Sequence, residues 1–277
     1  MILIADSGST KTDWCVAEGG KVVMRIATQG INPFHQDEKT IISIINDELM
    51  TQLGDTKTGA IYFYGSGCRD EFVPLMQSAF SRFFPQASAI EVHGDLLGAA
   101  RAVCGAGQGV ACILGTGANS CLYDGKAIVC NTPPLGYILG DEGSGAVLGR
   151  LLVNSVFKRQ LPDDICEAFV RETALTQADI IRRVYREPLA NRFLASLAPF
   201  VHRHIDSRPL QTLVVGNFRN FFRRNILQYG RPELPVGCVG SIAFFFAEQL
   251  REAAEAEGLV IGNILRSPMD GLVEYHK

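Results

Sequence analysis

The sequence predicts an α/β protein built from two similar halves, each expected to run βββαβαβα. The main observation is an internal repeat of strand, small polar loop, strand, turn and strand. Its first copy has apolar runs at 1–5, 13–17 and 21–27. Its second copy has apolar runs at 110–114, 121–123 and 127–130. An internal repeat of this size indicates a duplicated domain.

Helical and strand patterns alternate after each copy. In the first half they predict helices at 38–53, 71–83 and 96–104, and strands at 60–64 and 89–93. In the second half they predict helices at 144–158, 218–228 and 241–257, and strands at 212–215 and 236–239. Three antiparallel strands followed by alternating helices and strands are typical of a mixed sheet with helices on its faces.

The predicted domains follow from this repeat. We expect an N-terminal lobe at 1–97, completed by the C-terminal segment 255–277, and a C-terminal lobe at 98–254. The second lobe carries an insertion at 160–208 that reads as three helices. Thr176 and Asp179 fit a capping pattern at the start of the second of these helices.

Composition excludes several classes of protein. The chain has 277 residues, a net charge of -3 and a pI of about 6.0, which argues against a nucleic-acid partner. Its eight cysteines show no CxxC spacing, so a zinc site is not expected and buried free thiols are. No apolar run reaches the length of a membrane span or of a signal peptide, so we expect a cytoplasmic location and no membrane partner.

Two small polar loops occupy equivalent places in the repeat, at 6–12 and at 115–120. Small residues let backbone N–H groups approach phosphate oxygens. A single loop of this kind is also typical of an ordinary polar hairpin, but the pair favours phosphate binding. Neither loop opens a helix, which excludes a Walker A loop. Asp6, at the end of the first strand, is placed to hold Mg²⁺ through water.

The two loops resemble the phosphate-1 and phosphate-2 motifs of the actin/hexokinase/Hsp70 superfamily. Residues 213–217 resemble its adenosine motif, and residues 239–243 resemble the start of its second connecting helix. The closest family by this resemblance is the N-acetylglucosamine kinases and their BadF/BadG-type ATPase relatives, and the likeness covers nearly the whole chain. It implies two ribonuclease H-like lobes around an ATP cleft. The first loop has Ser-Gly-Ser where many members have three glycines.

The resemblance also implies which residues hold ATP, Mg²⁺ and the sugar. Those for ATP are Asp6, Gly8, Ser9, Thr10, Lys11, Gly115, Thr116, Gly117, Asn119, Gly216, Asn217, Gly240 and Ser241. Those for the sugar are Asn32, Ser66, Gly67, Gly136 and Asp141. Leu135 stands where the animal enzymes have tryptophan, which leaves the identity of the sugar open.

Asp95 is the predicted general base. It follows an apolar strand and opens a helix of small residues, and ligands of α/β sheets bind at that end of a strand. In the kinases that the chain resembles, an aspartate at this place takes the proton of the sugar hydroxyl. A plain helix N-cap is the alternative role for Asp95, and a cap for the helix that follows is the alternative for Asp141.

These observations predict an ATP-dependent kinase of an amino sugar, most of all N-acetylglucosamine at its 6-hydroxyl. A homodimer is common in the family, and the sequence itself gives no independent sign of the oligomeric state. Two alternatives stay open: an ATPase activator of a dehydratase, and a catalytically silent ATP-binding sensor. The aromatic run 244–246 reads as core between a helix and the sheet, and His202 and His204 do not share a helix face.

Overall fold

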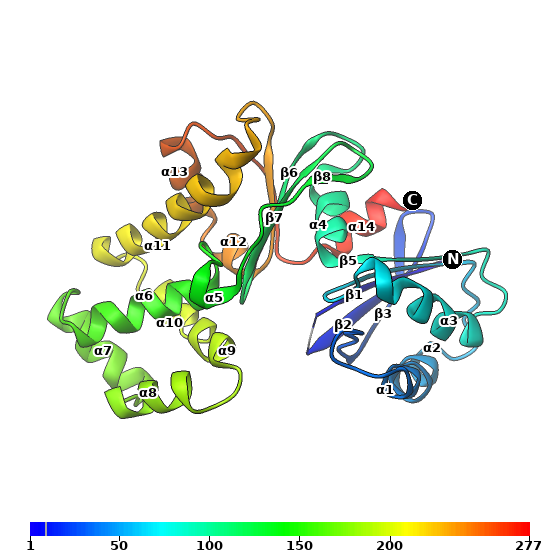
Figure 1. The fold of residues 1–277 in the computed structure, drawn as a ribbon, viewed down its shortest axis with the longest axis horizontal. Coiled ribbons are helices and arrows are strands. Elements are labelled where there is room, and N and C mark those ends of the chain that lie inside the picture. The colour runs from blue at the N-terminus through cyan, green and yellow to red at the C-terminus, as the bar shows by residue number, and fades with distance from the viewer. Residues whose placement is uncertain (9) are drawn as a thin grey trace. The chain divides into compact units, whose positions relative to one another are not determined.

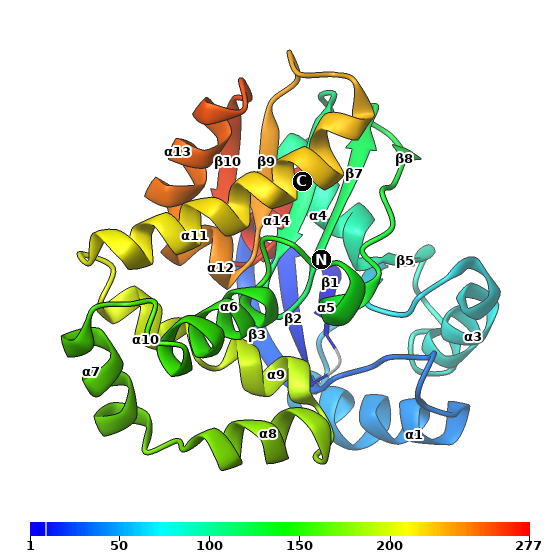
Figure 2. The same cartoon turned by 60° about the vertical axis from the view of Figure 1, so that its left-hand side comes forward.

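The computed structural model describes residues 1–8 and 10–277, so the predicted site residue Ser9 lies outside the described residues. The chain divides into two compact units (Figure 1, Figure 2). The first unit contains residues 1–107, 125–127 and 267–277, and the second contains residues 108–124 and 128–266. These bounds differ from the predicted lobes at 1–97 with 255–277 and at 98–254.

The first unit is built on a five-stranded mixed sheet of order β3-β2-β1-β4-β5. Its strands are β1 (Ile2–Ser7), β2 (Lys11–Glu18), β3 (Lys21–Gln29), β4 (Ala60–Gly65) and β5 (Ala89–Gly94). β1 is antiparallel to β2 and parallel to β4, which in turn is parallel to β5. The first two strands are longer than predicted, so Asp6 and Lys11 belong to strands and the loop between them is short.

Helices cover both faces of this sheet. Successive side chains of a strand point to opposite faces, and both sets of side chains in these strands are apolar. One face packs Trp14 and Phe63 against α1 (Glu38–Ser43), the π-helical turn η1 (Ile44–Met50), α2 (Thr51–Leu53) and α3 (Val73–Phe83). The 3-10 turn η2 (Asp70–Phe72) leads into α3. The other face packs Ile4 and Tyr64 against α14 (Met269–Tyr275), which lies beside α4 (Asp95–Cys104).

A buried polar contact fixes the C-terminal helix to the first sheet. Arg101 Nη1 donates to Tyr64 Oη at 2.6 Å, and Tyr64 Oη lies 2.8 Å from His276 Nε2. Burial lowers the pKa of His276 to about 4, so its ring is neutral at pH 7 and can accept the tyrosine proton. The part of the C-terminal segment that belongs to the first unit is therefore 267–277.

The second unit repeats the topology of the first. Its five-stranded sheet has the order β10-β9-β6-β7-β8. The strands are β6 (Gly109–Leu114), β7 (Ala118–Tyr123), β8 (Ile128–Cys130), β9 (Val236–Val239) and β10 (Ile261–Leu265). In both sheets the first strand lies between the second and the fourth, and the fifth lies at an edge, so the predicted duplication and the two-lobed α/β fold class are confirmed.

The predicted strand at 212–215 is wrong, because these residues lie inside α11 (Arg208–Phe221). The buried side chains of this helix recur at helical spacing, at Leu210, Val214, Phe218 and Phe221, and a three-residue apolar run is too short to tell helix from strand. The fourth strand is instead β9 and the fifth is β10. Because β10 pairs with β9, residues 255–266 belong to the second unit.

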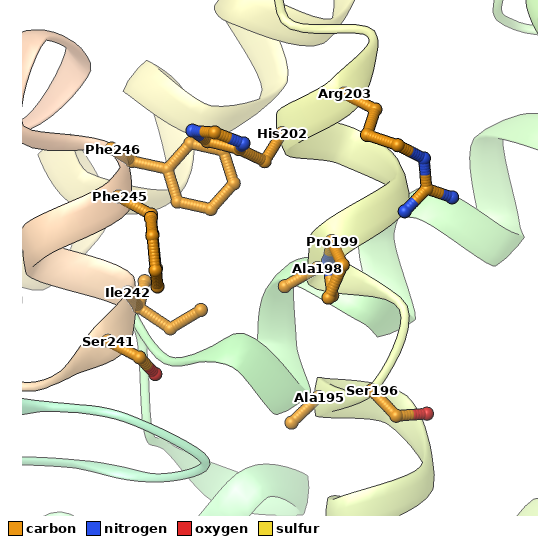
Figure 3. Close-up of a pocket in the computed structure, with 10 residues that line it drawn as sticks. All are labelled: Ala195, Ser196, Ala198, Pro199, His202, Arg203, Ser241, Ile242, Phe245 and Phe246. Carbon is orange, nitrogen blue, oxygen red and sulfur yellow. The ribbon is translucent and has the colours of Figure 1, made fainter.

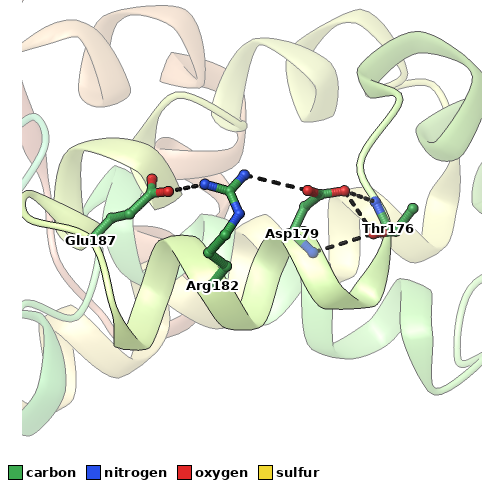
Figure 4. A network of polar contacts seen from close by, with 4 residues as sticks. All are labelled: Thr176, Asp179, Arg182 and Glu187. Atoms are coloured by element: carbon green, nitrogen blue, oxygen red, sulfur yellow. Dashed lines mark hydrogen bonds and ion pairs between the residues drawn. The ribbon is translucent and has the colours of Figure 1, made fainter.

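The helical insertion has more helices than predicted. Between 160 and 208 the structure has α7 (Asp163–Thr173), α8 (Gln177–Tyr185), α9 (Ala190–Ala195) and α10 (Ala198–Arg203). The capping box at the start of α8 is confirmed: Asp179 N donates to Thr176 Oγ1, and Thr176 N donates to the Asp179 carboxylate (Figure 4). Arg182 continues this network by bridging Asp179 and Glu187.

The remaining helices of the second unit complete its layers. They are α5 (Gly136–Leu139), α6 (Gly145–Phe157), η3 (Phe222–Ile226), η4 (Leu227–Tyr229), α12 (Ser241–Phe245) and α13 (Ala247–Ala256). α6, which confirms the helix predicted at 144–158, packs with α9 and α11. Every cysteine is a free thiol, and all but Cys104 and Cys130 are buried. Within the described residues, no helix has both the length and the apolar character required to cross a bilayer.

Candidate active site

The carboxyl ends of three parallel strands meet at one edge of the first sheet. The register aligns Ser7 of β1 with Gly65 of β4, and Gly65 with Gly94 of β5. Asp6 is the residue before this row, and Asp95 is the residue after it. The two carboxylates are close enough for the charge of Asp95 to raise the pKa of Asp6. Two predicted site residues from different strands therefore lie at the same edge, where ligands of such sheets bind.

Asp95 is the first residue of α4, and the N-cap is Gly94. Burial raises the pKa of the Asp95 carboxyl, while hydrogen bonds from the backbone N–H groups of Leu96 and Asp95 itself act in the opposite direction. A carboxyl with a raised pKa holds a transferred proton better than an ordinary aspartate does. Asp95 is thus oriented by the helix start without being its capping residue.

Asp6 carries a second perturbed carboxyl at this edge. Burial, then Asp95 and Asp13, raise its pKa to about 7, and the nearby Lys11 lowers it. Lys11 itself pairs with Asp13 at 2.5 Å. A carboxylate with excess negative charge around it is a favourable neighbour for a cation. No cluster of three or more His, Cys, Asp or Glu suited to a metal occurs within residues 1–8 and 10–277.

The short loop after β1 is fixed by backbone contacts. Gly8 N donates to Lys11 O at 3.0 Å, and Gly30 N donates to Thr10 O at 3.1 Å. Gly8 and Thr10 are exposed. The loop therefore presents small, accessible residues beside Asp6, as a phosphate-binding loop requires.

Three predicted sugar residues come together next to this edge. Asn32 is buried, and its Nδ2 donates to Ser66 Oγ at 3.4 Å. Gly67 has φ +76°, and a Cβ there would lie 2.2 Å from Asn32 Oδ1. Ser66 N donates to Ser7 O at 2.9 Å, which ties the group to the end of β1. Only glycine at position 67 leaves room for the Asn32 side chain.

In the second unit, the loop between β6 and β7 is held from two sides. Gly145 N donates to Gly115 O at 2.8 Å and Ala146 N donates to Thr116 O at 3.1 Å, so the start of α6 holds the loop carbonyls. On another side, Gly240 has φ +125°, and a Cβ there would lie 2.3 Å from Leu114 O. The close approach of the backbones explains the glycine at position 240, whereas a Cβ at Gly115 would meet no atom within 4 Å.

Asp141 lies directly against this loop. It has φ +54°, and a Cβ on Gly117 would lie 3.0 Å from its Oδ2. Burial raises the pKa of Asp141 to about 6, the N–H of Ala118 lowers it, and Glu142 raises it. The helix that follows is capped by Ser144, whose Oγ accepts from Val147 N at 3.1 Å. Capping therefore does not account for the Asp141 carboxylate.

A cavity of about 320 Å³ opens beside Ser241 in the second unit (Figure 3). Its lining residues are Ala195, Ser196, Ala198, Pro199, His202, Arg203, Ser241, Ile242, Phe245 and Phe246. Of the aromatic run predicted as core, Phe246 is 1% exposed, but Phe244 and Phe245 are 46% and 44% exposed. The core prediction is thus wrong for two of the three residues.

No protein-family model matches the chain, and no curated protein matches it. Among solved structures, a candidate N-acetylglucosamine kinase from Porphyromonas gingivalis is 51% identical. The match covers 100% of this chain and 98% of that one, with a TM-score of 0.95. The chain belongs to the N-acetylglucosamine kinase family.

Two more distant structures share the fold of this family. A candidate N-acetylglucosamine kinase from Chromobacterium violaceum is 17% identical, with a TM-score of 0.74 over 100% of this chain and 99% of that one. A ROK-family glucokinase from Streptomyces griseus, solved with glucose and AMPPNP, is 13% identical, with a TM-score of 0.58 over 99% and 97%. These likenesses support the two-lobed, actin/hexokinase-like architecture.

The structure also places four other residues that the family resemblance assigned to ATP or to the sugar. Asn217 is buried; its side chain accepts from Gly143 N at 3.0 Å and donates to Ser144 O at 3.3 Å, so it supports the turn that carries Asp141. Asn119 Oδ1 accepts from Asn131 Nδ2 at 2.9 Å. Gly216 has no neighbour within 4 Å of its Cβ position, and the same is true of Gly136.

The lining of the cavity was not predicted from the sequence. Its residues come from α9, α10 and α12 and from the residues that directly follow α9 and α12, and only Ser241 and Ile242 lie in a motif noted in the sequence. Pro199 and His202 lie in the helical insertion, and nothing in their local sequence distinguishes a cavity lining from an amphipathic helix. The one available signal was Ser241, which the sequence assigned to ATP and which lines the cavity.

Proposed function

We propose that this family member is an ATP-dependent kinase that transfers the γ-phosphoryl group to an amino sugar, with N-acetylglucosamine phosphorylated at its 6-hydroxyl. The observation that carries the proposal is the position of Asp95, at a sheet edge beside Asp6 and close to the loop of Ser66 and Gly67. The full-length similarity to a candidate N-acetylglucosamine kinase supports the same substrate class.

The first unit supplies the chemistry on the sugar in this proposal. Asp95 accepts the proton of the attacking hydroxyl, and burial, which raises its pKa, makes the carboxylate a stronger base than an exposed aspartate. Asn32, Ser66 and Gly67 orient the sugar, and orientation contributes much of the barrier reduction in phosphoryl transfer.

The second unit supplies the phosphate contacts. Backbone N–H groups and the hydroxyl of the loop at 115–117 donate to phosphate oxygens, and Asp141 accepts from sugar hydroxyls. Gly8, Thr10 and Lys11 of the first unit add donors to the outer phosphates. Asp6 is the residue that would hold Mg²⁺ through water, and the ion would supply neutralisation of charge on the phosphates.

The cavity at Ser241 is the proposed place for the base of ATP. Ile242, Phe245 and Pro199 offer apolar surface to a planar ring, and Ser196, Ser241 and His202 offer polar groups at its rim. A mostly apolar pocket with a few polar groups is typical of small-ligand sites. Phe245→Ala should raise KM for ATP and leave KM for the sugar unchanged.

The deciding experiment is ADP release with a panel of sugars. It contains N-acetylglucosamine, glucosamine, N-acetylmannosamine, glucose and a sample without sugar. We expect release to rise strongly with an amino sugar, and the product to carry phosphate on carbon 6 by NMR. A slow rate that no sugar changes would overturn the kinase proposal and favour the activator or sensor alternatives, and iron analysis of anaerobically purified protein would separate those two.

A further inference from the structure

Arg69 differs from the other arginines of the first unit. Arg25, Arg82 and Arg101 each lie within 3.6 Å of a carboxylate, those of Asp270, Glu38 and Glu91. Within the described residues, Arg69 forms no ion pair. Its guanidinium instead lies over the ring of Phe34, 4.8 Å from the ring centroid. Arginine in this position keeps its charge and its fork of N–H donors available to a ligand.

The ring that carries Arg69 is fixed to the proposed sugar residues. Phe34 N donates to Asn32 Oδ1 at 3.0 Å. Its ring packs edge-on against Phe72 with a centroid separation of 6.3 Å, yet the residue is 49% exposed. Arg69 is fixed in the same way, because its backbone N–H donates to Gly67 O at 3.0 Å. A cation and an aromatic ring therefore stand together beside Asn32 and Gly67.

The charges around this pair are mostly negative. Asp95 and Asp6 lie at the same sheet edge, and Asp70 follows Arg69 in the chain. The nearby cation Lys11 is paired with Asp13. A neutral sugar gains little from an unpaired cation at this place. Without Arg69, an anionic substituent would face the carboxylates of this edge, and the other basic groups are His35, beside the Phe34 ring, and the paired Lys11. The arginine would therefore decide whether such a sugar binds.

We propose that Arg69, held over Phe34, makes this protein selective for an amino sugar that bears a carboxylate substituent. This inference rests on the proposed kinase function and narrows its substrate class. A carboxylate matches the guanidinium in a two-point hydrogen bond, which lysine cannot reproduce. The sugar ring itself would lie against Asn32, Ser66 and Gly67.

The test compares N-acetylmuramic acid, which carries an ether-linked carboxylate, with neutral N-acetylglucosamine. The measured quantity is the ratio of their kcat/KM values. We expect the wild-type ratio to exceed one and to fall about 10- to 100-fold in Arg69→Gln, the range for a lost hydrogen bond to a charged group. Arg69→Lys should fall in between. Arg82→Gln, which removes another exposed arginine of this unit, should leave the ratio unchanged.

Calorimetric binding of both sugars to the same variants separates the two hypotheses. If neither sugar is phosphorylated, the kinase proposal fails, and the binding ratio still decides the role of Arg69. If N-acetylglucosamine is phosphorylated but Arg69→Gln leaves both ratios unchanged, the inference on Arg69 is overturned and the kinase proposal stands. Circular dichroism of each variant verifies that the fold is retained.

Discussion

The two units have the same strand order but carry different residues at corresponding loops. The edge of the first sheet gathers carboxylates, Asp6 and Asp95, whose pKa values are raised by burial. The loop after the first strand of the second unit contains Gly115 and Gly117. The backbone of Gly240 lies so close to this loop that a Cβ there would be 2.3 Å from Leu114 O. The comparison therefore sets a sheet edge with buried carboxylates in the first unit against a closely packed loop in the second unit.

This difference has a physical consequence for substitutions. In the first unit the sensitive quantity is charge, because two carboxylates share a poorly solvated edge. In the second unit the sensitive quantity is volume, because backbones approach more closely than a Cβ permits. Changes of charge should therefore act most strongly in the first unit, and additions of a methyl group in the second.

The largest expected effect comes from Asp95→Asn. The amide keeps the shape of the side chain but cannot accept a proton, so kcat should fall about 10²- to 10⁴-fold. Steady-state ADP release with the active sugar measures this loss. Asp55→Asn, at an exposed position of the same unit, is the matched control and should keep full activity. Near-normal turnover in Asp95→Asn would remove it from the role of base.

Adding a methyl group at Gly240 tests whether the second unit is sensitive to side-chain volume. Gly240→Ala forces an alanine into φ +125° and against Leu114 O, and we expect a loss of about 2–4 kcal/mol in the free energy of unfolding. Gly216→Ala, in open space on α11, should instead gain up to about 1 kcal/mol. Urea denaturation measures both, and changes of the same sign would contradict this account of the loop.

Gly67→Ala tests whether side-chain volume also matters beside the sheet edge of the first unit. The new Cβ would displace Asn32 Oδ1, so KM for the sugar should rise about 5- to 10-fold, the equivalent of one lost hydrogen bond. KM for ATP should change little. Gly54→Ala shares the positive φ but meets no atom within 4 Å, so it isolates the backbone strain from the clash. An unchanged sugar KM in Gly67→Ala would separate Asn32 from the sugar site.

The smallest expected effect is the pH dependence of Asp6→Asn. The folded-state pKa of about 7 lies above the unfolded value near 3.8, so the folded protein binds this proton more tightly. Wild-type stability due to Asp6 is therefore present below pH 4 and is lost as pH rises towards 7 and above. Asp6→Asn cannot ionise, so it should gain stability relative to the wild type as pH rises from 4 to 8.

Asp37→Asn should change the pH dependence of the free energy of unfolding in the opposite direction. Hydrogen bonds from Thr40 lower the pKa of this exposed carboxylate, so its contribution is present above the unfolded pKa and lost as pH falls. Paired urea titrations at both pH values measure the two slopes. Parallel slopes for Asp6→Asn and Asp37→Asn would show that the first unit's edge does not concentrate charge.

The fold could be predicted from local patterns where those patterns were long or repeated. The alternating strands at 13–17 and 21–27, the helix at 144–158 and the capping residue Thr176 all agree with the structure. The three-residue apolar run at 213–215 was misread, because its burial depends on which side of α11 faces the core. β10 was missed because it is an edge strand with partly exposed residues.

The sequence by itself determined the duplication, the two small polar loops and the position of Asp95 between a strand and a helix. These features depend on local periodicity and on glycine chemistry, which act over a few residues. Only the tertiary structure decided that Asn32 meets Gly67, that Arg69 lies over Phe34 and that a cavity opens beside Ser241. Those contacts join residues distant in the chain, and their geometry follows from strand register and helix packing that no local pattern specifies.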